Sequence, residues 1–497
     1  MKYKLLSSLF FLLQLTICIG QTESKKDSAA IYQLNEVVVK GIIAKKRKQV
    51  SENVEVLSKE TIYNNDGFQY QTVLNQIPGV FMQNGVLNTN RITIRGIGAR
   101  SPFATTSIRT YFGDIPLTDG NGISAIEDLE FATLQAIEVH KGPAASSFGV
   151  GLGGAIILQP NFGEYNNLET SIQTTHGSFG LLRNVASVQY GNNKMKSNYV
   201  YSNTHSDGYR ENNEYDRQTF TALVHWDISD KDKLQVTGNF TDLKAYIPSS
   251  LNYDDYITSP EKAAFTWGAS QGNEDFQSYL AGITWQHLFK KDLELKTSTF
   301  GSFKKNYESR PFNILDEDSK IFGARTQLSK KGKQFSWGVG GEYFYDNNSN
   351  KTLENLYSAS NPGSVAGEIL TNFNEFRSYY NLFLELEFKV NKQFLINSGF
   401  NLNKTQYNIK NQTVNNSESF GFNPVFSPKL GFVYLANSVL KFRGNVAHGF
   451  ANPTSEETLL PDGIFNPDLN AEKGWNLEFG IDYTSKNNKL IIKLKIK

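Results

Sequence analysis

The residue types that usually carry catalysis are scattered in this chain rather than grouped. The single cysteine, Cys18, lies in an N-terminal apolar run, which excludes a disulfide framework and a cysteine-based metal site. The glycine-rich runs 96–98 and 151–154 lack the strand-to-helix setting of a phosphate loop. The histidines are far apart and give no ligand-spaced pair: His140, His176, His205, His225, His287 and His448. We therefore predict no catalytic residue, no metal site, no cofactor and no enzyme activity, and expect non-covalent binding instead.

One short segment is suited to binding through its backbone. The run Leu34, Asn35, Glu36, Val37, Val38, Val39 is β-prone and has no pairing partner nearby in the sequence. An unpaired strand of this kind can add to the sheet edge of another protein, because main-chain donors and acceptors pair largely regardless of side chain. The alternative is that Val37–Val39 is the first strand of the domain that follows.

Length and composition limit the class of protein. A chain of 497 residues exceeds the usual size of one domain, so we expect two. Hydrophobic residues make up 39% and the mean hydropathy is −0.41, which argues against several membrane helices of about 20 apolar residues each. The 24 Tyr, 35 Phe and 40 Gly suit a large antiparallel β structure, and the net charge of +1 gives no basic field for nucleic acid.

The N-terminus has the pattern of an export signal. Lys2 and Lys4 precede the apolar run Leu5–Ile19, so residues 1–20 are predicted to be a signal peptide cleaved near Gly20. A lipoprotein signal with Cys18 as the modified residue is the alternative, but Ile17 then stands where a small residue is wanted. Residues 21–45 follow as a mainly polar tail.

From about Leu168 onward, long segments alternate between apolar and polar residues. Tyr380, Leu382, Leu384, Leu386, Phe388 and Val390 share one face, and Trp475, Leu477, Phe479, Ile481 and Tyr483 share another opposite Asn476, Glu478 and Asp482. Many segments reach about 10 residues, enough to cross a bilayer, whereas strands of soluble sheets average about 5–6. The pattern predicts a membrane β-barrel over residues 165–497, with long outer loops at 245–272, 308–319 and 346–374.

The region before these strands reads as a small mixed α+β domain over residues 46–160. Tyr70, Val73, Leu74 and Ile77 fall at helical spacing ahead of Pro78. The runs 91–95 and 135–140 alternate as strands do, and Gly-rich turns follow each.

Five motifs in this domain, taken in order and at this spacing, resemble the plug domain of TonB-dependent outer-membrane receptors. They are Ile77-Pro-Gly-Val80, Arg91-Ile-Thr-Ile-Arg-Gly-Ile-Gly98, Asp114-Ile-Pro-Leu117, Ile137-Glu-Val-His-Lys-Gly-Pro143, and Ser146-Ser-Phe-Gly149 with Gly153-Gly-Ala-Ile156. Phe450-Ala-Asn-Pro-Thr-Ser455 and Asn466-Pro-Asp-Leu-Asn-Ala-Glu472 resemble the same family's barrel, so the likeness covers nearly the whole mature chain. One motif departs from the family, because Gly113-Asp114 stands in reversed order before Ile115-Pro116.

The resemblance implies a fold: an antiparallel outer-membrane β-barrel with the α+β plug inside it. Family barrels have about 22 strands, whereas we count roughly fifteen candidates after Leu168, and the chain ends at Lys497 without a terminal aromatic residue. An open barrel is unfavourable in lipid, because its edge strands leave backbone groups unpaired. We therefore expect that this chain, whose barrel is incomplete, is a C-terminally truncated receptor. A naturally smaller closed barrel is the weaker alternative.

The resemblance also implies a function, namely active import across the outer membrane of a Gram-negative bacterium. Segment 34–39 resembles the TonB box, which pairs with TonB, itself energised by ExbB and ExbD. The runs 95–103 and 114–120 resemble receptors for ferric siderophores or ferric citrate, so a ferric chelate is the expected substrate. Cobalamin, another metal complex, a small glycan, or a non-transporting role in surface binding or adhesion remain as alternatives.

Site residues follow from the same resemblance. We expect the ligand near plug loops 84–89 and 98–106, where Arg100 supplies a cation for an anionic chelate, Ser101 a donor and Phe103 an apolar wall, although loop packing would suit them equally. Ion pairs between plug and barrel are expected from six residues: Arg91, Arg95, Arg109, Glu127, Glu138 and Lys141. The remaining partner is the lipid of the outer membrane.

Overall fold

The computed structural model describes most of the chain beyond the predicted tail. The described residues are 38, 39, 41, 43, 45, 46, 49–65, 67, 69–87, 90–101, 104–290, 292–358, 362–458, 466, 468–484 and 491–496. The predicted signal peptide, residues 34–37 of the predicted TonB box, and Phe103 lie outside these residues. None of the helices in the described part has the length and apolar character needed to cross a membrane.

The region expected to form the plug is a compact α+β domain. Its five-stranded sheet has the order β3-β8-β9-β6-β7, in which β6 and β9 are parallel and the other pairs antiparallel. A separate hairpin pairs β4 with β5. The strands are β3 (Val54–Ser58), β4 (Val80–Asn84), β5 (Asn90–Ile94), β6 (Ile108–Phe112), β7 (Ile115–Pro116), β8 (Leu134–Lys141) and β9 (Gly154–Pro160). The helices are α2 (Lys59–Tyr63), α3 (Tyr70–Leu74), a 3-10 turn (Phe131–Thr133) and α4 (Ala145–Phe148).

Apolar residues from most elements of this domain meet in one core. The predicted helix forms as α3, and its buried residues Tyr70, Val73 and Leu74 pack with residues of β5, β6, β8 and β9. Gly98 ends the turn after β5 with φ +93, and a Cβ at this position would lie 2.9 Å from the carbonyl oxygen of Ile92. Only glycine fits there without strain, so the glycine of this motif is a requirement of the backbone.

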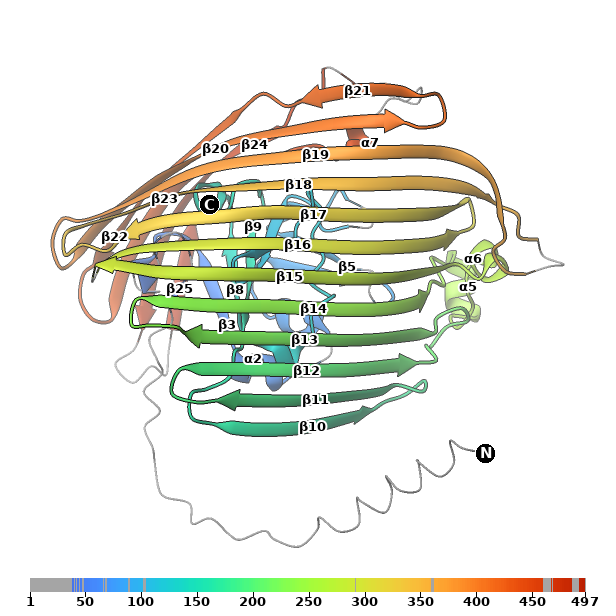
Figure 1. Cartoon of the computed structure of the whole chain (residues 1–497), viewed down its shortest axis with the longest axis horizontal. Coiled ribbons are helices and arrows are strands. Elements are labelled where there is room, and N and C mark those ends of the chain that lie inside the picture. The colour runs from blue at the N-terminus through green and yellow to red at the C-terminus, as the bar shows by residue number, and fades with distance from the viewer. Residues whose placement is uncertain are drawn as a thin grey trace, which may run out of the picture. The chain divides into compact units, whose positions relative to one another are not determined.

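Among the described residues that follow the small domain, one antiparallel sheet contains 16 strands (Figure 1). Neighbours in sequence are neighbours in space from β10 to β20, then β22, β23, β24 and β25 follow, and β21 pairs the outer part of β20. The strands are β10 (Leu168–His176), β11 (Leu182–Gly191), β12 (Met195–Ser206), β13 (Tyr215–Asp227), β14 (Asp232–Tyr246), β15 (Asn273–Lys290), β16 (Leu293–Arg310), β17 (Asn313–Lys330), β18 (Phe335–Asn355), β19 (Ala366–Lys389), β20 (Phe394–Asn411), β21 (Asn416–Gly421), β22 (Val425–Leu435), β23 (Leu440–Ala451), β24 (Glu472–Thr484) and β25 (Ile491–Ile496).

The alternation predicted from the sequence places opposite chemistry on the two faces of the sheet. On β19, Tyr380 and Leu382 are exposed, Leu382 to 59% of its surface, while Asn381 and Glu385 are buried at 1% and 2%. The buried face is the one that meets the small domain, because Leu223 of β13 belongs to the core of that domain. The predicted apolar face of 380–390 therefore points away from the small domain.

Turns and loops divide between the two ends of the sheet. At one end the strands connect through short turns, such as 228–231 and 390–393, and at the other the segment 247–272 carries α5 (Tyr253–Thr258) and α6 (Phe265–Ser270). The prediction of a loop at 245–272 is thus confirmed. The loops predicted at 308–319 and 346–374 are largely wrong, because β16 to β19 continue through most of those residues. Backbone pairing extends the strands there without requiring apolar side chains.

The sheet has two edges among the described residues. Its order begins at β10 and ends at β25, and no pairing between these two strands is present in the part of the chain that the structure describes. Nearly every residue of β10 is exposed. The expected incomplete barrel of about fifteen strands is confirmed by this topology.

The outward direction of the 380–390 face can be tested by charge. Leu382→Arg should lower the free energy of unfolding in lipid vesicles by about 2–4 kcal/mol, because a cation on the lipid face near mid-bilayer destabilises the folded barrel. Ile369→Arg is the matched control: Ile369 is similarly exposed at 51%, but it lies near the end of β19 that carries the long loops, so it should cost about 0–1 kcal/mol. Urea titration of vesicle-bound protein measures both, and equal costs would contradict the assignment of this face.

Candidate functional site

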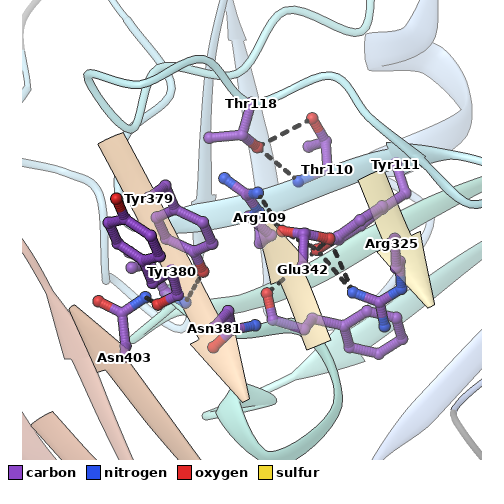
Figure 2. A network of polar contacts seen from close by, with 12 residues as sticks. Arg109, Thr110, Tyr111, Thr118, Arg325, Glu342, Tyr379, Tyr380, Asn381 and Asn403 are labelled. Carbon is purple, nitrogen blue, oxygen red and sulfur yellow. Dashed lines mark hydrogen bonds and ion pairs between the residues drawn. The ribbon is translucent and has the colours of Figure 1, made fainter. Parts of the chain in front are cut away.

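A buried charge cluster joins the small domain to the sheet (Figure 2). Strand β6 alternates, so that Ile108 and Phe112 enter the core of the small domain while Arg109 and Tyr111 face the other way. Arg109 Nη2 lies 2.8 Å from Glu342 Oε1 on β18, and the Tyr111 hydroxyl donates to Glu342 Oε2 at 3.0 Å. Arg325 of β17 approaches the same carboxylate, with Nη1 2.8 Å from Oε2. One carboxylate thus pairs with two guanidinium groups from different domains.

Aromatic rings complete the surroundings of this cluster. The guanidinium of Arg109 lies 4.8 Å from the ring centre of Tyr379 and 5.2 Å from that of Phe344. Burial alone lowers the pKa of Arg109, but Tyr111, Tyr379 and Glu342 raise it above the ordinary value. Burial, followed by the charge of Glu342, raises the pKa of Tyr111. Arg109 therefore stays charged and Tyr111 neutral, as a hydrogen-bond donor, at neutral pH.

A second polar contact lies in the turn 117–124. The Asp119 carboxylate accepts from the backbone N–H groups of Asn121 and Ile123, both at 2.9 Å. The next residue, Gly120, donates its N–H to Asp346 of β18 at 3.1 Å, and Asp346 also pairs Arg377 of β19 at 3.0 Å. Burial raises the pKa of Asp119 to about 6, with Arg377 opposing the rise and Asp346 adding to it.

Two of the three predicted ligand residues, Arg100 and Ser101, are described, and Arg100 lies at the end of the sheet with the long loops. The side chain of Arg100 is 95% exposed, and its Nη1 is 3.3 Å from Glu472, the first residue of β24 after the segment 452–471. Ser101 accepts a hydrogen bond from Arg91 through its carbonyl at 2.7 Å. The guanidinium of Arg100 is therefore exposed at this end of the sheet, and its role in ligand binding stays a prediction.

Two of the six residues expected between plug and barrel make such contacts, Arg109 with Glu342 and Arg95 with Glu478 of β24. The contacts shown for the other four lie within the small domain. Arg91 donates to the carbonyls of Ala99 and Ser101, and Glu127 accepts from the N–H of Ile126.

Glu138 is 3.5 Å from His140 and also accepts from Gln159, and Lys141 donates to the Pro78 carbonyl at 3.1 Å. Both residues therefore support the small domain from within.

The tail segment has a partner of its own. Val38–Val39 form β1, which pairs antiparallel with β2 (Lys45–Lys46) in a two-stranded sheet separate from the five-stranded one. No group of three or more His, Cys, Asp or Glu side chains among the described residues is arranged to hold a metal ion.

Family models match both regions of the chain. The model "TonB-dependent Receptor Plug Domain" matches residues 46–156, and "TonB dependent receptor-like, beta-barrel" matches residues 224–494. The second match covers more than half of the chain. The chain belongs to the TonB-dependent receptor family. It is accordingly a protein of the Gram-negative outer membrane, its small domain is the plug, and the large sheet is barrel wall.

Solved structures share this fold at low sequence identity. The ferric citrate transporter FecA in its unliganded form is 15% identical with a TM-score of 0.72, over 88% of this chain and 68% of that chain. FpvA of P. aeruginosa bound to heterologous pyoverdines is 14% identical with a TM-score of 0.74, over 91% and 63%. The copper transporter OprC is 14% identical with a TM-score of 0.71, over 88% and 70%. The chain thus spans 63–70% of the length of these three.

Sequence reasoning missed the barrel residues that hold the plug. Glu342, Arg325 and Arg377 are charged residues on the inward face of their strands, and the residue after Glu342, Tyr343, is exposed on the outward face. Strand parity was the available signal, since it separates inward from outward positions. It cannot say which inward charge meets which plug residue, because that depends on how the plug is seated.

Removing the charge of Glu342 should destabilise the seated plug more than removing the charge of Arg109. Glu342→Gln should destabilise the seated plug by about 3–5 kcal/mol, because two buried guanidinium groups lose their countercharge. Arg109→Gln should cost less, since Arg325 still neutralises Glu342. Amide hydrogen exchange of β6 in lipid-reconstituted protein measures both. Lys262→Gln breaks an exposed pair with Asp255 and should cost about 1 kcal/mol or less. Equal effects of Glu342→Gln and Lys262→Gln would contradict the role of the cluster.

The turn 117–124 should become less stable as the pH rises through the range from about 4 to 6. The pKa of Asp119 is higher in the folded turn than its ordinary 3.8, so the folded state binds more protons in that range and stability falls with rising pH. Asp119→Asn keeps a carbonyl acceptor and should remove this dependence. Exchange of the amides at 120–124, corrected for intrinsic rate, measures the effect, and an unchanged pH slope in Asp119→Asn would refute it.

Proposed function

We propose that this receptor imports a ferric chelate of the siderophore or ferric citrate type across the outer membrane, driven by TonB with ExbB and ExbD. The observation that supports this most directly is the attachment of the plug. Ion pairs such as Arg109–Glu342 and Arg95–Glu478 bind it to the wall. Polar contacts of this kind can be replaced by water once the plug moves, which suits a removable closure.

The exposed charge near the loops supports an anionic substrate. Arg100 projects with its side chain 95% exposed, paired only loosely with Glu472 at 3.3 Å. An anionic chelate would compete with Glu472 for this guanidinium and gain a charge-assisted hydrogen bond. Ser101 would add a hydroxyl donor and Phe103 an apolar wall. Ligand binding near Arg100 and TonB binding to the tail would then occur at two coupled sites, and their binding free energies must be linked reciprocally.

Energy for import has to come from the inner membrane, because the outer membrane sustains no ion gradient. In this proposal TonB pairs with segment 34–39 by strand addition. Its pull rearranges the plug, while the barrel strands stay embedded in lipid.

The proposal has two parts, import of a ferric chelate and its dependence on TonB. Both are tested by uptake of labelled iron in cells that express the receptor from its own gene and lack other ferric receptors. Val37→Pro should abolish accumulation, because proline removes a backbone donor from the pairing strand. Ser28→Pro, in the polar tail ahead of the segment, is the matched control and should transport normally. Equal uptake by wild type and Val37→Pro would overturn the TonB-driven mechanism.

A panel of ligands separates the substrates: ferric citrate, ferric hydroxamate, ferric catecholate, cobalamin, a copper complex and an oligosaccharide. Accumulation of one of the last three alone would overturn the ferric substrate. Surface binding without accumulation would instead support an adhesion role.

A further inference from the structure

Three segments that are distant in sequence converge on Glu385 of β19. The backbone N–H of Ile43, in the tail, donates to Glu385 Oε2 at 3.4 Å. The Ser147 hydroxyl of α4 donates to Oε1, and Lys429 Nζ of β22 lies 3.4 Å from the same oxygen. All four residues are buried. A buried carboxylate depends on such donors, because an unpaired charge away from water is costly.

The tail is fixed to this point from both sides. Ile43 lies in the turn between β1 and β2, so a pull on Val38–Val39 reaches Ile43 within a few residues. Further along, Glu52 pairs Lys429 at 2.6 Å. A displacement of the β1–β2 hairpin that carries Ile43 with it would remove one donor from Glu385, while Lys429 on β22 would stay in place.

Ser147 connects this carboxylate to the charge cluster described above. Its hydroxyl contacts Glu385, and its carbonyl accepts a hydrogen bond from Arg325 Nη2 at 2.7 Å. Arg325 in turn shares Glu342 with Arg109. Because both atoms belong to one residue of a four-residue helix, a displacement of the Ser147 backbone changes its contacts with both Glu385 and Arg325.

We infer that Glu385 and Ser147 are positioning residues that couple the periplasmic tail to the Arg109–Glu342–Arg325 cluster. When Ile43 leaves, Glu385 loses a donor, shifts toward Lys429 and weakens its hold on Ser147. The carbonyl of Ser147 then withdraws from Arg325, and the cluster that seats β6 loosens. The inference rests on the proposed function only for the identity of the partner that pulls.

Hydrogen exchange of the β6 amides in the full chain, reconstituted in lipid vesicles, tests this coupling without substrate or TonB. Ile43→Pro removes the N–H that contacts Glu385, and Ile43→Ala keeps it while removing the same buried side chain. Ile43→Pro should raise β6 exchange about fivefold or more over Ile43→Ala. In a Ser147→Ala background the ratio of Ile43→Pro to Ile43→Ala should fall to about one, because the link is already absent.

A ratio of one in the wild-type background, or a ratio unchanged by Ser147→Ala, would overturn the inference. In uptake assays, Ser147→Ala should lower the rate at saturating chelate while chelate affinity stays unchanged. A wild-type receptor that accumulates no ligand would overturn the proposed function alone, since the exchange ratios are measured independently of transport.

Discussion

The constraint that shapes this protein is that lipid offers no hydrogen-bond partners. Strands in contact with lipid must pair through their backbones and turn apolar side chains outward. Because side chains alternate along a strand, the inward face is then free to be polar. On β19 the two faces are separated by single residues, with Leu382 outward and Asn381 inward. The plug thus meets a largely polar wall, and its attachment combines charges and hydrogen bonds with apolar contacts, such as those of Leu223 with the plug core and of Ile115 with Phe344.

One plug strand, β6, contacts both the plug's own core and the barrel wall. Ile108 and Phe112 of β6 fill the plug's own apolar core, while Arg109 and Tyr111 between them reach Glu342. Stability of the plug as a domain and its attachment to the barrel are therefore carried by alternate residues of one strand. A buried ion pair is weak evidence for stability, since desolvation offsets much of the attraction. It does fix orientation, because Arg109 of β6 has Glu342 as its buried countercharge only while the plug is seated.

The buried polar contacts between plug and barrel form a connected set rather than isolated pairs. Ser147 touches Glu385 through its hydroxyl and Arg325 through its carbonyl. Because these residues are buried, a charge that loses one hydrogen-bond donor cannot easily replace it with water. The loss of one contact therefore weakens the neighbouring contacts as well. Connectivity of this kind is a physical basis for communication between a tail at one end of the lumen and a charge cluster within it.

Periodicity alone determined much of this fold. The alternation in 380–390 fixed β19 and its outward face, and the helical spacing of Tyr70, Val73 and Leu74 fixed α3, because both patterns arise from local backbone geometry. The extension of β16–β19 through 308–319 and 346–374 was not visible, since polar strands beyond the membrane have no apolar face. Pairing of Arg109 with Glu342, 233 residues apart, was decided only by tertiary structure. Every inward charge has the same sequence pattern, and the seating of the plug selects which of them meet.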